Sequence, residues 1–170
     1  IHASQGKYEE ADPVVMRAIE IQENALGPDH PSLADSLGTR GNLLRAQAKY
    51  DEADRLHLRC IEIKERALGP DHPSLAPSFS NRAVVLQAQV WKVCPWDTTG
   101  KFDEADRLYL RAIEIQEREF GPDHPDLAVC FSNRAGLFQR QGRYDESDRL
   151  LLRCIEIQER ALGTDHPTLA

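Results

Sequence analysis

Four histidines are the residues best suited by type to metal or acid–base chemistry, and all four stand in one repeated phrase. The phrase reads ALGPDHPSLA at 25–34 and again at 67–76, EFGPDHPDLA at 119–128 and ALGTDHPTLA at 161–170. Its histidines are His30, His72, His124 and His166. Zinc ligands must converge within about 2.1 Å of one ion, whereas equivalent residues of stacked helical units lie about 10 Å apart. The spacing therefore argues against a metal site and favours a turn.

The same phrase carries signals for the end of one helix and the start of the next. Gly69 follows a long amphipathic stretch and suits the position just past a last helical turn. Pro73 suits the first turn of a new helix, and Asp71 is expected to accept hydrogen bonds from the free N–H groups of that helix. Each copy of the phrase therefore predicts a connection between two helices.

No enzyme motif accompanies the histidines. The sequence contains no G-x-x-x-x-G-K-[ST], H-E-x-x-H, G-x-S-x-G or G-x-G-x-x-G. Its acidic residues recur with the repeat, which is typical of solvated helix faces. We therefore expect no catalytic residues, no metal and no cofactor.

Composition narrows the class of protein further. Of 170 residues, 41% are hydrophobic and 29% are charged, which is typical of a folded soluble chain, and the formal net charge is −7. A negative chain is a poor nonspecific binder of nucleic acid or anionic membranes, and its apolar runs are too short to span a bilayer. The four cysteines form no C-x-x-C and there is no N-x-[ST] sequon, so a reducing, cytoplasmic location is expected.

The glycines of the phrase give the length of the repeat. Gly27 and Gly69 are 42 residues apart, as are Gly121 and Gly163, whereas Gly69 and Gly121 are 52 apart. One unit therefore carries ten extra residues. Internal repetition at this period is the signature of a solenoid.

Each unit has the pattern of two helices. Between Tyr50 and Leu68, apolar residues recur at helical spacing, while oppositely charged residues three and four apart occupy the other face. The predicted fold class is all-α, an α-solenoid of antiparallel helix pairs. Its long helices are expected near 8–26, 50–68, 102–120 and 144–162, alternating with shorter ones.

The period divides the chain into units of a single array, 1–170. They are a partial repeat 1–26, complete repeats 31–68, 73–120 (with an insert at 90–99) and 125–162, and the start of a further repeat at 164–170. Residues 1–6 are expected to end an earlier helix, because ASQGKY parallels QRQGRY near residue 140. Terminal repeats normally carry polar caps, so we expect a fragment of a longer array or a partial gene model.

The repeat resembles a known family. GKYEEAD…RAIEIQENALGPDHPSLA is similar to the 42-residue tetratricopeptide repeat of kinesin light chains. Similar repeats occur in nephrocystin-type proteins and in the repeat tails of nucleotide-binding immune-type receptors. The resemblance implies a right-handed superhelix whose first helices line a concave groove for peptides or partner helices.

Candidate groove residues follow from the first helices, LGTRGNLLRAQ (37–47), FSNRAVVLQAQ (79–89) and FSNRAGLFQRQ (131–141). In the family this segment resembles LNNLAxLY, and its second asparagine often bonds the backbone of a bound peptide. That asparagine matches Asn81 and Asn133, whereas the first unit has Thr39. The alternative is that these amides bond a neighbouring helix and fix the superhelix. Further groove candidates on the same face are Asn42, Arg45, Ser80, Gln87, Ser132, Gln139 and Arg140.

Two departures concern residues expected to face the core. Arginine replaces the leucine of the family pattern at Arg40, Arg82 and Arg134. Because an unpaired buried charge is costly, each should pair with an acid on a long helix, with Asp54, Asp106 and Asp148 as candidates, or else extend to the groove edge. His57 replaces an apolar residue on a long helix and is interpreted as a half-buried packing residue.

The ten-residue insert VWKVCPWDTT (90–99) contains both tryptophans, Trp91 and Trp96. It is expected to form a loop at one edge of the solenoid. Three interpretations stay open: a partner-binding loop, because long loops and tryptophans are often functional; a self-ligand for the groove; and a neutral insertion or gene-model artefact.

The leading functional hypothesis is an interaction scaffold that binds partner peptides in its groove. The resemblance implies kinesin heavy chain or a cargo adaptor as partner, with no role for nucleic acid or membrane. The alternative is a sensing or regulatory array within a larger nucleotide-binding immune-type receptor. Neither hypothesis sets an oligomeric state.

Overall fold

A computed structural model of the chain describes residues 2–92 and 99–162. Its helices are α1 (His2–Leu26), α2 (Pro31–Ala46), α3 (Tyr50–Leu68), α4 (Leu75–Lys92), α5 (Thr99–Phe120), α6 (Pro125–Arg140) and α7 (Tyr144–Leu162). The described residues contain no strand. The all-α prediction is confirmed; α3 and α7 have the predicted bounds, whereas α1 and α5 begin earlier than predicted, at His2 and Thr99.

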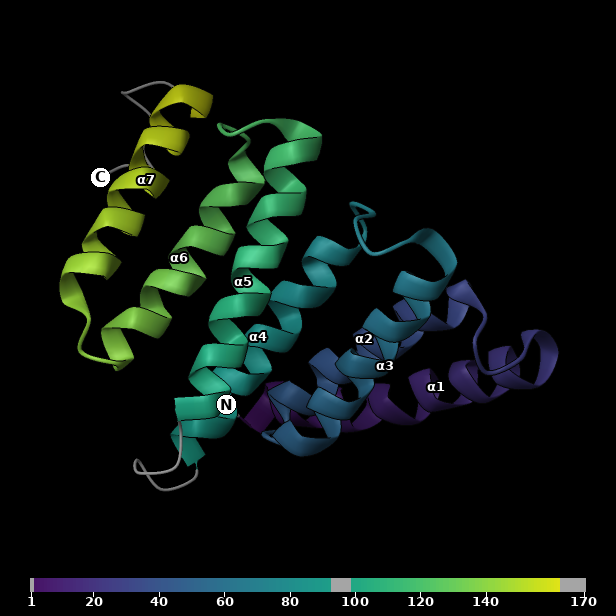
Figure 1. Cartoon of the computed structure of the whole chain (residues 1–170). Coiled ribbons are helices and arrows are strands. Elements are labelled where there is room, and N and C mark those ends of the chain that lie inside the picture. The colour runs from purple at the N-terminus through teal and green to yellow at the C-terminus, as the bar shows by residue number, and fades with distance from the viewer. Residues whose placement is uncertain (1, 93–98, 163–170) are drawn as a thin grey trace.

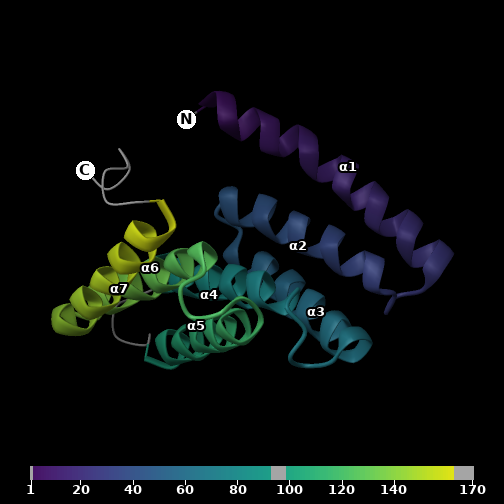
Figure 2. The same ribbon diagram turned by 90° about the horizontal axis from the view of Figure 1, so that it is seen from above.

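Neighbouring helices pair into units, α2 with α3, α4 with α5, and α6 with α7. The units follow one another along a curved row, in which helix direction turns progressively from α1 to α7 (Figures 1 and 2). The fold is therefore a superhelix of helix pairs.

The short helices line the inner side of the curve. α2 contacts α4, and α4 contacts α6, whereas the long helices of neighbouring units make no such contact within the described part of the chain. Elements that approach more closely lie on the concave side of a bent row. The concave surface therefore belongs to α2, α4 and α6, and the convex surface to α1, α3, α5 and α7.

The core lies between helix layers and repeats with the units. One cluster joins α3, α4, α5, α6 and α7 through fully buried Leu75, Ile115, Leu127 and Ile157. A second joins α1, α2 and α3 through Leu33, Leu37 and Ile63. Because these two clusters extend from one unit into the next, the array is stabilised by stacking of units rather than by one central core.

The expectation for residues 1–6 is wrong. They do not end a separate helix, because α1 runs without a break from His2 to Leu26. In the equivalent turn before α7, Gly142 has a positive φ of 74° and lies between α6 and α7, which pack as a pair. At the matching position, Gly6 lies inside α1.

Part of the insert belongs to the two flanking helices. Residues 90–92 extend α4, and Thr99 opens α5. Only 93–98 stands between the two helices, and this segment, with Trp96, lies outside the described residues. Trp91 belongs to α4, and its side chain also lies outside what the structure describes. The three interpretations of the insert remain predictions.

Candidate functional site

The histidines of the repeated phrase cap helices. The Nδ1 atoms of His30, His72 and His124 accept hydrogen bonds from backbone N–H groups two residues on, at 3.2, 3.2 and 3.3 Å. The turn interpretation is confirmed for these three, and His166 lies outside the described residues. The part of the chain described holds no cluster of His, Cys, Asp or Glu suited to a metal.

The proposed capping role of Asp71 is wrong. The histidine occupies that role, and α4 begins at Leu75, two residues after Pro73, because turn-type bonds such as that from Leu75 N to His72 O (3.0 Å) close the first turn. Asp71 instead binds Arg111 and Arg118 of α5. Hydrogen bonds from these arginines hold the pKa of Asp71 below its usual value, and the bond from Arg118 has the largest effect.

This ionic contact recurs at the other turns. Asp29 binds Arg66 at 2.9 Å, and Asp123 binds Arg160 at 2.7 Å and Arg153 at 3.0 Å. Arginines also donate to the carbonyl oxygens of Pro28, Pro70 and Pro122. The repeated Pro-Asp-His therefore has two structural roles. Its histidine caps the N-terminus of a short helix, and its proline carbonyl and aspartate bind arginines of the next long helix.

The three arginines that replace leucine pair with acids, as predicted. Arg40 binds Asp12 at 3.0 Å, Arg82 binds Asp54 at 2.8 Å and Glu104 at 2.7 Å, and Arg134 binds Asp106. Each aspartate lies 28 residues before its arginine, on the long helix of the preceding unit. The partners of Arg82 and Arg134 were among the candidates. Asp148 was a wrong candidate, because this register assigns it none of the three arginines.

We expect Asp54→Asn to lower the free energy of unfolding by about 1–2 kcal/mol. The Arg82 side chain is only 12% exposed and would keep a single carboxylate partner, Glu104. Urea denaturation measures the change. Asp148→Asn is the matched control, because Asp148 has the same repeat position, is exposed and forms no ion pair with another described residue. Equal losses in the two variants would contradict a specific role for the Arg82 pair.

His57 is fully buried rather than half-buried. Neither of its ring nitrogens has a hydrogen-bond partner among the described residues. Burial, followed by the charge of Arg45, lowers its pKa to about 4, so the ring is neutral at pH 7. The ring packs against Gly41 of α2, where an added Cβ would lie 2.7 Å from Nε2. His57 is therefore a packing residue that needs a glycine opposite it.

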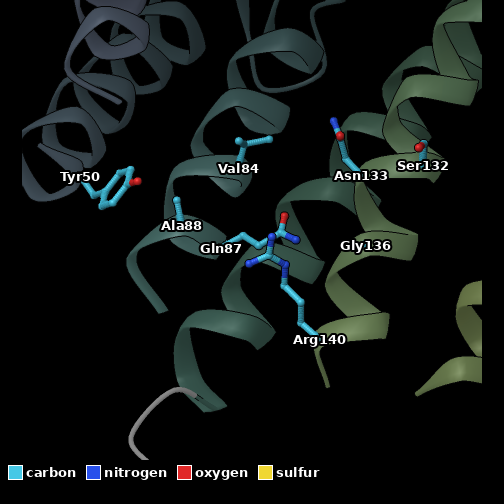
Figure 3. A pocket seen from close by; sticks show the side chains of 8 residues that line it. All are labelled: Tyr50, Val84, Gln87, Ala88, Ser132, Asn133, Gly136 and Arg140. Carbon is cyan, nitrogen blue, oxygen red and sulfur yellow. The ribbon is translucent and has the colours of Figure 1, made fainter. Parts of the chain in front are cut away.

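The concave surface contains a hollow of about 410 Å³ between α4 and α6 (Figure 3). The first turn of α3 contributes Tyr50, α4 contributes Val84, Gln87 and Ala88, and α6 contributes Ser132, Asn133, Gly136 and Arg140. Gln87 and Arg140 reach into the space from opposite helices (Figure 3). The hollow thus combines an apolar wall with amide, hydroxyl and guanidinium groups.

Four of the nine groove candidates, Gln87, Ser132, Asn133 and Arg140, come together in this hollow. The others lie elsewhere on the short helices: Asn42 and Arg45 on α2, Ser80 and Asn81 on α4, and Gln139 on α6. Ser80 is engaged with the neighbouring unit, because its Oγ lies 3.1 Å from Cys130 Sγ. As a binding site the whole set stays a prediction.

The side chains of Asn81 and Asn133 are half-buried. Neither side chain hydrogen-bonds another residue within 2–92 or 99–162. Asn133 lines the hollow, where its amide is open to an incoming peptide, whereas Asn81 lies outside the hollow. Both the groove role and the structural role of these two amides stay predictions.

Half of the residues that line the hollow carry no sequence signal for binding. Tyr50 belongs to the periodic stretch of its long helix, and Val84, Ala88 and Gly136 are small or apolar. Gly136 offered one signal, because it shares its repeat position with Asn42 and Val84 and leaves a space there.

The arrangement defines a class of protein, an α-solenoid of helix pairs with an extended concave surface. The family model for the tetratricopeptide repeat matches residues 1–66, 34–89 and 98–160, and the chain belongs to that family. A search of curated proteins finds no significant match. The described residues contain no helix long and apolar enough to cross a bilayer.

Solved structures place the repeats in the kinesin light chain type. The chain is similar to a kinesin light chain-like protein of Podosopora anserina with nearly identical TPR-like repeats, at 25% identity and a TM-score of 0.78, over 98% of this chain and 74% of that one. BtubC (BKLC) of P. vanneervenii shares the fold at 19% identity and a TM-score of 0.76, over 95% and 60%. MamA of MSR-1 also shares the fold, at 19% identity and a TM-score of 0.58, over 94% of this chain and 72% of that one.

Proposed function

We propose that the concave surface binds an extended segment of a partner protein, and that the hollow between α4 and α6 is its central contact. The family assigns the chain a scaffold role in protein–protein interaction. The observation that carries the finer proposal is the Asn133 amide, which has no hydrogen-bond partner within 2–92 and 99–162 and lies at the edge of a hollow with an apolar wall.

The chemistry of the hollow suits a peptide. An asparagine amide both donates and accepts, and an extended peptide presents one N–H and one C=O per residue. Val84, Ala88 and the ring of Tyr50 offer apolar contact to a side chain. Arg140 adds a guanidinium group, which favours a carboxylate. Recognition would therefore combine backbone hydrogen bonds with one seated side chain.

The kinesin light chain resemblance extends this proposal to a biological role. We propose a non-enzymatic adaptor in the cytoplasm, whose partner is a cargo adaptor or kinesin heavy chain. Concave arrays of this kind present a long surface to a flexible ligand.

Replacing both Asn81 and Asn133 with alanine is expected to weaken peptide binding while the fold is retained. Each lost hydrogen bond should reduce the binding free energy by about 0.5–1.5 kcal/mol. The probe is a peptide selected on the wild-type chain from a random library, and calorimetry measures its affinity. Helix content from circular dichroism should stay unchanged.

Two further variants sharpen the test. Gly136→Val should block the hollow, because valine is already accepted at the same repeat position as Val84. Asn24→Ala removes an exposed amide from α1, on the convex side, and should leave affinity unchanged. Unchanged affinity in the Asn81/Asn133 double variant and in Gly136→Val would remove the hollow from the binding site.

A further inference from the structure

A buried tyrosine of the convex layer holds the side chain of Gln87 in place. Tyr109 of α5 is 0% exposed, and its hydroxyl donates a hydrogen bond of 3.1 Å to Oε1 of Gln87. Gln87 itself lies on the wall of the hollow, on α4. A residue of the convex layer thus fixes the side chain of a residue on the concave surface.

The chemistry of the phenol determines which end of the amide it takes. Burial raises the pKa of Tyr109 well above its usual value, so the phenol keeps its hydrogen at neutral pH. With the amide reversed, the nitrogen would donate to the phenol, and the phenol hydrogen would lose the acceptor that it has in the structure, Oε1 of Gln87. Leaving a buried donor unpaired is unfavourable, which favours the orientation in which Oε1 faces the phenol.

The nitrogen end of Gln87 is consequently the end left for a ligand. Nε2 lies 3.8 Å from the position that a Cβ on Gly136 would occupy, on the opposite side of the hollow. The hollow therefore presents an N–H donor at this point. Arg140 beside it also offers donors only.

The pairing belongs to the middle unit alone among the three complete ones. At the repeat position of Gln87 the other units have Arg45 and Gln139, and at that of Tyr109 they have His57 and Leu151. Arg45 can only donate, whichever residue packs against it, and Leu151 cannot form a hydrogen bond with Gln139. Of these three positions, only Gln87 has a side chain that can both donate and accept and whose orientation is set by a buried hydrogen-bond partner.

We propose that Tyr109 is a positioning residue that commits Gln87 to donate, so that the hollow selects a peptide bearing a hydrogen-bond acceptor at this point. The acceptor is a backbone carbonyl or a carboxylate of the bound segment. This inference rests on the proposed function and names the ligand group that the site prefers.

The test compares Tyr109→Phe with the wild-type chain. The probe is a library-selected peptide made in two forms, with aspartate or with the amino side chain of 2,4-diaminobutyrate at the position most sensitive to Gln87→Ala. We expect the wild-type preference for aspartate to fall on the order of fivefold in Tyr109→Phe, the equivalent of one hydrogen bond. Arg140 keeps its charge in both proteins, so electrostatic preference alone would not change.

Two controls separate positioning from stability. Tyr144→Phe changes an exposed tyrosine of α7 and should leave the preference intact. Gln87→Glu makes the position an acceptor and should reverse the preference. In the unliganded protein, the side-chain NH₂ signals of Gln87 should move and broaden in Tyr109→Phe, because the amide is freed to rotate.

The outcomes are distinct. A reduced preference with altered Gln87 signals supports the inference. An unchanged preference and unchanged signals overturn it, while binding that still depends on Asn133 leaves the proposed function standing. Selected peptides whose binding ignores Asn81, Asn133 and Gly136 would overturn both.

Discussion

Replacing Gly41 with alanine is expected to lower the free energy of unfolding by about 2 kcal/mol, although alanine is the better helix former. The new Cβ would lie within 2.9 Å of three atoms of the His57 ring. That ring is fully buried, so it cannot swing out into solvent without losing its packing. Gly38→Ala on the same helix is the control, because its nearest neighbour, Cys60 Sγ, would be at an ordinary 3.6 Å.

A double variant tests the cause of the loss. The third complete unit, 125–162, has Ala135 and Leu151 at the positions of Gly41 and His57. In a His57→Leu background, Gly41→Ala should therefore be neutral or should stabilise by up to about 1 kcal/mol, the usual gain of alanine over glycine in a helix. Urea denaturation of the four proteins gives the coupling energy directly. A coupling energy near zero would show that the ring is not what excludes alanine.

His57 is also expected to make the fold sensitive to mild acid. Its pKa is about 4 in the folded chain against 6.5 when unfolded. Above pH 6.5 neither state holds the proton, and the contribution is constant. Between 6.5 and 4 the unfolded state binds a proton that the folded state lacks, so stability falls as pH falls. The total loss is on the order of 3 kcal/mol by pH 4.

Unfolding free energies at pH 7 and pH 4.5 measure this effect. His57→Leu should flatten most of the dependence in that window, because it removes the buried titrating group and the unpaired ring nitrogens. Aspartates such as Asp71, whose pKa is lowered by arginines, lose their contribution only at lower pH. The same decline in wild type and His57→Leu would assign the acid sensitivity to other groups.

The sequence alone determined the helices, the repeat and the class of protein. Periodicity within each unit is local, and Gly69 and Gly121 end their helices with positive φ angles of 88° and 86°, as glycine after a last turn commonly does. The arginines' need for acidic partners was also readable, because a charge at a core-facing position must be compensated wherever the partner lies. About half of the hollow was predictable from hydrogen-bonding residues on the short helices.

Tertiary structure decided which residues meet. The 28-residue register that gives Asp12 rather than Asp54 to Arg40 depends on how one unit stacks on the next, and so does the pairing of Gly41 with His57. Histidine rather than aspartate caps the short helices, because Asp71 and Asp123 form ion pairs with arginines of the next long helix. The hollow depends on Gly136, a residue defined by the side chain it lacks, and the space it leaves exists only once α4 and α6 lie side by side. Contacts between units are set by packing across the row, and no local pattern of residues encodes them.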